Sequence, residues 1–221
     1  MIPKIIHQLI PDLLPKRYLH CILSVTTCHP EFEHRIYDDN LIHSFMKTHF
    51  SEYYEKFSKL PRKIMQIDMV RYFLLYKYGG IYIDADYYMF KQFDLLDFKV
   101  VLPINRESNN GDIENLGNCI FASEPNNPFF KLLIDSLFNI NRTNIDVKND
   151  DNIDCSIYGT GPKFVHHIYD TYDSKEEICT PAKKYFHPIT NTSVTHLQNL
   201  HKTQITYGMH FCQGNWRNNK L

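Results

Sequence analysis

The sequence lacks the features that mark several common classes of protein. No two of its six cysteines form a C-x-x-C pair, which argues against a zinc ribbon or a thioredoxin-like site and favours reduced, structural thiols. Charge of one sign is not in excess, because 24 basic residues balance 25 acidic ones, so the bulk charge does not favour nucleic acid or an acidic membrane as a partner. These absences leave small or neutral partners as the expectation.

Long apolar runs, internal repeats and low-complexity linkers are also missing. No stretch approaches the ~18 apolar residues that a membrane-spanning helix needs, and the sequence starts directly with Met1-Ile2-Pro3-Lys4, without a signal peptide. We therefore expect a cytoplasmic protein with no membrane span. Its 221 residues, 43% of them hydrophobic, predict a single globular domain over residues 1–221.

The most informative stretch runs from Lys63 to Phe90. Apolar residues recur there at steps of three and four, which predicts an amphipathic and substantially buried helix that ends at Gly79-Gly80. Ile81-Tyr82-Ile83 then has the β-branched and aromatic composition of a strand. The strand delivers Asp84-Ala85-Asp86 at its carboxyl end, which is where open α/β sheets place their ligand sites.

Asp84 and Asp86 are candidate metal ligands. Residues two apart in an extended chain face the same side, so both carboxylates can converge on one hard divalent cation, which also binds substrate phosphates. An isolated Asp-x-Asp is usually a pair of turn or surface carboxylates. The preceding helix, glycine stop and strand make metal binding the favoured interpretation, because two acids that close a buried strand need a partner.

The segments Asp68–Tyr72 and Leu75–Asp86 together resemble the signature of DXD-containing glycosyltransferases of the Och1-like mannosyltransferase family, glycosyltransferase family 32. The resemblance implies an α/β GT-A fold, that is, a mixed, mostly parallel central sheet flanked by helices. It also implies a nucleotide-sugar donor with Mn²⁺ or Mg²⁺ as the cofactor. On this basis residues 1–90 are the expected nucleotide-binding half and residues 91–221 the acceptor-binding half.

The opening Ile2–Gln8 is similar to the family's first strand, and its apolar run fits a buried parallel strand. Ile6, His7 and Gln8 are therefore candidates for the nucleotide site, although His7 also fits a packed structural histidine. Members of the family commonly continue with a tryptophan that stacks on the base. This chain has Leu9-Ile10-Pro11 there, which would offer a base only an aliphatic surface.

Further elements follow from local patterns. We expect helices over Tyr18–Thr27, Leu41–Phe50, Phe129–Phe138 and Lys163–Tyr172, strands over Phe32–Tyr37 and Val100–Ile104, and a loop over Asn105–Asp112. Asp38-Asp39 either caps the helix that follows or contacts the donor. The Asn- and Asp-rich residues 139–154 are a plausible rim of the acceptor site.

The resemblance assigns roles to residues elsewhere in the chain. Asp68 and Arg71, three residues apart on one helix face, would hold the donor sugar, with a local ion pair as the alternative. Asn118 is a further sugar contact or a plain strand-edge residue. Gly161, at a helix start, would approach the donor. Near the end of the sequence, His210 is the third candidate metal ligand, with packing against Trp216 as its alternative, while Trp216 and Arg217 would close over the donor phosphates.

Three functions remain open from the sequence. The first is a metal-dependent, retaining transferase that moves a hexose from a UDP- or GDP-sugar to a hydroxyl of a glycan, lipid or protein. The second is a metal-dependent nucleotidyltransferase or phosphodiesterase, which also uses paired carboxylates on a cation. The third is an inactive sugar-binding module, against which the intact Asp68, Arg71, Asp84 and Asp86 argue. The sequence does not indicate an oligomeric state.

Overall fold

The structure is a computed structural model that describes residues 1–10, 16–138, 159–188 and 205–211. Its centre is a six-stranded sheet of order β2-β1-β3-β8-β5-β9. The pairs β2–β1, β1–β3 and β5–β9 are parallel, whereas β8 runs antiparallel to both of its neighbours. The expected mixed, mostly parallel α/β sheet is therefore confirmed.

The strands are β1 (Ile5–Leu9), β2 (Glu33–Tyr37), β3 (Gly80–Ile83), β4 (Tyr87–Met89), β5 (Val100–Val101), β6 (Ile104–Glu107), β7 (Ile113–Leu116), β8 (Ile120–Ser123), β9 (Ile178–Cys179) and β10 (Gly208–His210). The helices are α1 (Lys16–Cys28), α2 (Asp39–His49), α3 (Ser51–Ser58), α4 (Lys63–Tyr78), α5 (Pro128–Ser136), α7 (Pro162–Thr171) and α8 (Lys183–Phe186), with a 3-10 turn at Lys175–Glu177.

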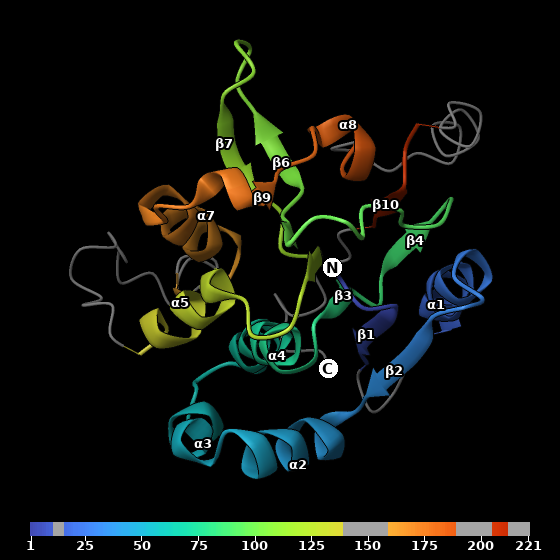
Figure 1. The fold of residues 1–221 in the computed structure, drawn as a ribbon. Helices are drawn as coiled ribbons and strands as arrows, with labels where there is room; N and C mark the ends of the chain where they lie inside the picture. The colour runs from blue at the N-terminus through green and yellow to red at the C-terminus, as the bar shows by residue number, and fades with distance from the viewer. Residues whose placement is uncertain (11–15, 139–158, 189–204, 212–221) are drawn as a thin grey trace.

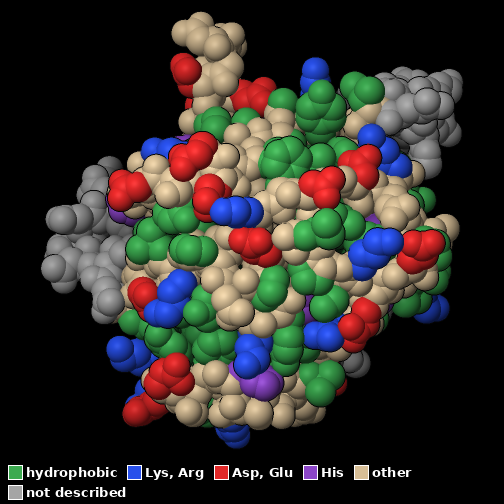
Figure 2. Space-filling view, in the orientation of Figure 1, with side chains coloured by type: hydrophobic (Ala, Val, Ile, Leu, Met, Phe, Trp, Pro, Cys, Tyr) green, Lys and Arg blue, Asp and Glu red, His purple; other side chains and the backbone are tan. Residues whose placement is uncertain are grey.

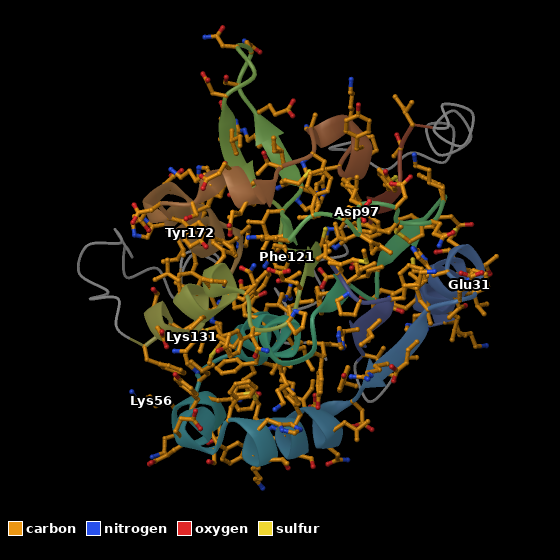
Figure 3. The ribbon with its side chains drawn as sticks, viewed as in Figure 1. Glu31, Lys56, Asp97, Phe121, Lys131 and Tyr172 are labelled. Carbon is orange, nitrogen blue, oxygen red and sulfur yellow. The ribbon has the colours of Figure 1, made fainter. Side chains whose placement is uncertain are left out.

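Two apolar cores cover the two faces of the sheet. Helices α2, α3, α4, α5 and α7 pack on one face, where Tyr82 and Phe121 project from the strands. On the other face, α1, α8 and β4 pack over Ile6 and Ile81. Figure 1 shows α4 end-on at the centre, with α2 and α3 below it and the β6–β7 hairpin projecting at the top. Phe121 lies deep in the molecule, whereas Glu31 and Lys56 lie at its periphery (Figure 3).

Helix α4 is more deeply buried than its apolar pattern predicts. Met65, Gln66 and every residue from Asp68 to Leu75 are buried, so apolar and polar faces alike are covered by protein. The reason is position, since α4 lies between α3, α5 and the strands β1, β3 and β8. Its polar residues Asp68 and Arg71 therefore have to find partners inside the protein.

The predicted glycine stop of α4 is confirmed. Gly79 caps the helix with φ of 64° and donates its N–H to the Leu75 carbonyl at 2.9 Å. Gly80 has φ of 94°, and a Cβ atom there would lie 2.4 Å from the Ile5 carbonyl oxygen. The close approach of β1 and β3 thus requires glycine at this position.

Other expectations need correction. Helix α3 was not predicted. The expected strand Val100–Ile104 is two strands in different sheets, because Pro103 has no N–H to continue the ladder. The expected loop Asn105–Asp112 includes most of β6 and the turn of the β6–β7 hairpin, which the Ser108 hydroxyl closes by accepting from the N–H groups of Asn110 and Asp112.

The remaining predicted helices and the strand Phe32–Tyr37 are confirmed, with ends that differ by one or two residues. Asp38 is the N-cap of α2, because its Oδ1 atom accepts from the Leu41 N–H at 2.8 Å. Within the described residues, no helix is both long and apolar enough to cross a membrane. Acidic and basic side chains are interspersed on the face shown in Figure 2. Residues 139–154 lie outside the described residues, and the division at residue 90 stays a prediction.

His7 makes stability depend on pH. It is fully buried between the Gly79 carbonyl, 2.9 Å from its Nε2 atom, and the Tyr37 hydroxyl, 3.0 Å from its Nδ1 atom. Burial lowers the pKa of His7 from 6.5 to about 4. The unfolded chain therefore takes up a proton before the folded chain does, so stability is lost as pH falls from 6.5 to 4, by up to about 3 kcal/mol from this residue.

We expect His7→Asn to flatten the pH dependence of the free energy of unfolding in that window. Urea unfolding at pH 7, 5.5 and 4.5 measures it, and the exposed His20→Asn is the matched control. A slope as steep in His7→Asn as in the wild type would contradict the assignment.

Candidate active site

Asp84, Asp86 and His210 converge at the carboxyl end of β3. Each offers one ligand atom, and these atoms all lie within 4.8 Å of one another. The Nε2 atom of His210 is 2.8 Å from Asp86 Oδ1 and 3.6 Å from Asp84 Oδ2. The three side chains are 16% to 21% exposed, so the cluster is sheltered yet reachable from solvent.

The local backbone brings His210 to the two acids. Strand β10 pairs antiparallel with β4, with His210 opposite Tyr87, and the Phe211 N–H donates to the Asp86 carbonyl at 3.0 Å. The ring of His210 stacks on that of Tyr87 at a centroid distance of 6.2 Å. A histidine far along the sequence is thereby fixed beside the acidic pair, as the prediction of a third ligand requires.

The donor set fits a divalent cation. Two adjacent ligands of an octahedral ion at about 2.1 Å stand ~3 Å apart, which is close to the spacings of His210 from the two carboxylates. Two carboxylates with one imidazole suit Mn²⁺, because carboxylate oxygens favour hard ions and imidazole nitrogen is softer. Asp84, Asp86 and His210 would hold such an ion.

The carboxylate of Asp84 is held in place from behind. Its Oδ1 atom accepts a hydrogen bond from the Tyr82 hydroxyl and lies 3.5 Å from Nη1 of Arg71, while Oδ2 faces His210. Burial raises the pKa of Asp84, and the positive charge of Arg71 counters that rise. Protein groups thus orient one oxygen of Asp84 and leave the other directed toward the candidate metal position. Hydrogen-bonding partners behind metal ligands usually have this effect.

Arg71 connects this cluster to Asp68. Its guanidinium lies 2.9 Å from Asp68 Oδ1, donates to the Asn118 carbonyl and stacks on the Tyr82 ring at 4.7 Å. The neighbouring carboxylates raise the pKa of Arg71 despite its burial, so it stays charged. The buried guanidinium of Arg71 is therefore a positive charge that Asp84 and Asp68 share.

Asp68 has three donors. Besides Arg71, the Asn118 amide donates to Oδ1 at 3.1 Å and the Thr160 hydroxyl donates to Oδ2 at 3.1 Å. Burial raises the pKa of Asp68 to about 6, while Arg71 and the two hydrogen bonds work against that rise. The side chains of Asp68 and Arg71 are only 5% and 2% exposed, so they form the floor of the site.

The remaining candidates are placed differently. Ile6 and His7 are buried, and the contacts of His7 favour its structural interpretation. Gln8 is also buried, accepting from His34 Nε2 at 2.7 Å and donating to the Asp84 carbonyl at 3.4 Å. Gly161 is the N-cap of α7. Trp216 and Arg217 lie outside the described residues.

Two site residues were missed by the sequence analysis. Tyr82 shares a strand face with Asp84, two residues on, so strand periodicity could have identified its contact with that carboxylate. Thr160 had no such signal, because its contact with Asp68 spans 92 residues. The roles of all these residues in binding or catalysis stay predictions.

Comparison with known proteins shows which families and structures this chain is similar to. Residues 15–106 match the family model described as the glycosyltransferase sugar-binding region containing DXD motif. Over this region, which is less than half of its length, the chain is similar to the DXD-containing glycosyltransferases. The matched region holds Asp68, Arg71, Asp84 and Asp86, whereas Asn118, Thr160 and His210 lie beyond it.

Curated relatives of this chain include glycosyltransferases, and a solved structure shares its fold. Inositol phosphoceramide mannosyltransferase 3 of Schizosaccharomyces pombe is 29% identical over 177 residues, which are 77% of this chain and 46% of the relative. A glycosyltransferase of Acanthamoeba polyphaga mimivirus is 28% identical over 200 residues, which are 85% of this chain and 74% of the viral protein. The solved PaToxG glycosyltransferase superposes with a TM-score of 0.55 at 20% identity, covering 79% of this chain and 71% of that chain.

These findings confirm the resemblance and the GT-A fold. The chain spans less than half the length of the Schizosaccharomyces pombe relative. The activity, substrates and partners of the whole protein are therefore argued separately below.

The geometry gives a direct test of His210. We expect His210→Ala to raise the Mn²⁺ concentration needed for half-maximal binding by about tenfold or more, because the nitrogen ligand beside Asp86 is lost. Isothermal titration with Mn²⁺ measures it, and the exposed His20→Ala is the control. An unchanged titration would show that His210 only packs against Tyr87.

Proposed function

We propose that this DXD glycosyltransferase transfers a hexose from a UDP- or GDP-sugar to a hydroxyl group, using a divalent cation held by Asp84, Asp86 and His210. The observation that carries the proposal is the convergence of these three ligands at the carboxyl end of β3. The match of residues 15–106 to the DXD family supports the reaction class. Retention of the anomeric configuration is proposed from the family resemblance alone.

The residues of the site have different roles in the proposed reaction. A bound cation supplies the positive charge that stabilises the leaving diphosphate, so no strong acid is needed on that side. Tyr82 and Arg71 orient Asp84 for that ion. On the floor of the site, Asp68 accepts and Arg71 donates, which matches the two hydrogen-bonding capacities of a sugar hydroxyl. Asn118, half-buried beside Asp68, can do both.

Mannose is the proposed hexose and a lipid-linked hydroxyl the proposed acceptor. The relative from Schizosaccharomyces pombe is an inositol phosphoceramide mannosyltransferase, and its similarity covers 77% of this chain. A hydroxyl on a glycan or a protein is the alternative acceptor. The neutral balance of charge, with a net charge of -1, agrees with a small donor and does not favour nucleic acid.

A nucleotidyltransferase or phosphodiesterase is less well supported. Such enzymes typically clamp the reacting phosphate between two metal ions about 4 Å apart. Across the part of the chain that the structure describes, one group of three or more potential ligands is found, and it is Asp84, Asp86 and His210. A single cation at this site suits a reaction in which the diphosphate leaves intact.

A product assay tests the proposal. The purified chain is incubated with GDP-mannose or with a UDP-hexose and inositol phosphoceramide, in Mn²⁺, Mg²⁺ or EDTA, and products are identified by mass spectrometry. We expect a mannosylated lipid, free nucleoside diphosphate and no product in EDTA. Release of nucleoside monophosphate would favour the phosphodiesterase, and metal-dependent donor binding without any product would favour a sugar-binding module. NMR of the product's anomeric proton tests retention.

A further inference from the structure

Of the three donors to the Asp68 carboxylate described above, Thr160 lies farthest from it along the sequence. Its hydroxyl lies 3.1 Å from Oδ2 of Asp68, whereas Arg71 and Asn118 both serve Oδ1. Among the described residues, Thr160 is therefore the hydrogen-bond donor that fixes the second oxygen. Without it, the carboxylate is held at one oxygen and can rotate about its last torsion.

Thr160 is itself held rigidly against α4. Its carbonyl accepts a hydrogen bond from the Tyr72 hydroxyl, and the residue is 2% exposed. Asp68 and Tyr72 are four residues apart on α4, so they lie one above the other on the same helix face. Helix α4 thus contacts Thr160 at two points, through the threonine hydroxyl and through its carbonyl.

The position of Thr160 in the chain extends this contact to α7. Gly161, the next residue, is the N-cap of that ten-residue helix, so the contacts of Thr160 fix where α7 begins relative to α4. A buried carboxylate also keeps its charge only when donors surround it. The hydroxyl of Thr160 therefore has two effects on Asp68, since it sets the orientation of the carboxylate and supports its ionised form.

We propose that Thr160 is a positioning residue for the donor-sugar site, which holds the Asp68 carboxylate in the orientation that meets the sugar hydroxyls together with Arg71. The proposal rests on the proposed function, because it assumes that Asp68 and Arg71 contact the sugar. It predicts that the Thr160 hydroxyl matters for the hexose part of the donor and not for its diphosphate, since the hydroxyl donates to Asp68, which is not one of the three candidate metal ligands.

The test compares two nucleotide ligands, GDP-mannose and GDP, and three variants. Thr160→Val keeps the shape of the side chain and removes the hydroxyl, while Thr160→Ser keeps the hydroxyl. Thr206→Val is the matched control, because Thr206 is 4% exposed and its hydroxyl makes one hydrogen bond, to the Lys184 carbonyl at 3.0 Å. Binding of GDP-mannose and of GDP is measured by isothermal titration in Mn²⁺, alongside kcat and KM for transfer.

We expect Thr160→Val to weaken GDP-mannose binding by about tenfold or more, as the loss of a hydrogen bond to a charged group does, with GDP binding unchanged. Thr160→Ser should restore donor binding and kcat/KM to within roughly threefold of the wild type, since the hydroxyl is present again. Thr206→Val should lower thermal stability and leave the ratio of the two affinities as in the wild type.

Three results would overturn the inference alone. The first is wild-type donor binding and transfer in Thr160→Val. The second is a loss of donor binding in Thr160→Ser as large as that in Thr160→Val, and the third is a loss of GDP binding in Thr160→Val as large as its loss of GDP-mannose binding. A wild-type chain that binds no nucleotide sugar in Mn²⁺ would instead overturn the proposed function, and this inference with it.

Discussion

Asp86→Asn is expected to abolish transfer while leaving the protein folded. The substitution keeps the size of a side chain that is 16% exposed, but it removes a negative charge and weakens the oxygen ligand 2.8 Å from His210 Nε2. Loss of a partner behind a metal ligand already costs ~10–100-fold in metal affinity or activity, so loss of a direct ligand should cost at least ~100-fold. The measurements are kcat with saturating Mn²⁺ and the Mn²⁺ affinity by titration.

The control for this variant is Asp135→Asn. Asp135 is 43% exposed on α5 and pairs with Lys131 and Tyr53, neither of which belongs to the candidate site, so the same chemical change there should leave transfer and metal affinity unaltered. Circular dichroism and thermal unfolding verify that both variants are folded. Turnover of Asp86→Asn within a few-fold of wild type would refute the metal assignment.

Arg71→Met is expected to produce the largest loss of stability. The methionine fills a similar volume, yet it leaves the buried Asp68 and the partly buried Asp84 without the cation that both of them contact, and it frees the Asn118 carbonyl. Breaking a buried ion pair by removing one partner costs about 3–5 kcal/mol, because the remaining charge is uncompensated. The free energy of unfolding in urea at pH 7 measures the effect.

Arg106→Met provides the comparison for that substitution. Arg106 also pairs with a carboxylate, Glu114 at 2.7 Å, but its side chain is 74% exposed, and exposed pairs contribute about 0–1 kcal/mol. If Arg71→Met and Arg106→Met cost the same, Arg71 does not act as the shared counterion of the two buried acids.

The stretch around the acidic pair could be predicted because its determinants are local. Apolar spacing predicts α4, the Gly79-Gly80 pair predicts where it ends, and the β-branched and aromatic residues that follow predict β3, which delivers Asp84 to the sheet edge. The burial of the polar face of α4 was not predictable, since the covering elements come from distant parts of the chain. The strand order could not be predicted from the sequence either, because β8 and β5 enter the sheet through long-range pairing.

The site residues likewise differ in whether local sequence patterns or long-range packing determine their positions. Asp84 and Asp86 follow from strand periodicity, but the approach of His210 rested on the family resemblance, since 124 residues separate it from Asp86. The contact of Arg71 with Asp84 depends on how α4 packs beside β3, and that of Thr160 with Asp68 on where α7 begins. Such contacts are set by tertiary packing, which spacing along the sequence does not encode.

The separation of His210 from Asp86 also affects how the protein is made. A ribosome adds about 5–20 residues per second, so the second aspartate leaves it several seconds before the histidine does. During that interval β4 has no β10 to pair with, and the nascent chain holds two carboxylates without their nitrogen partner. Under the proposed function, full affinity for the cation, and the protection that its binding would give against unfolding, would therefore arise late in synthesis, after most of the sheet has had time to form.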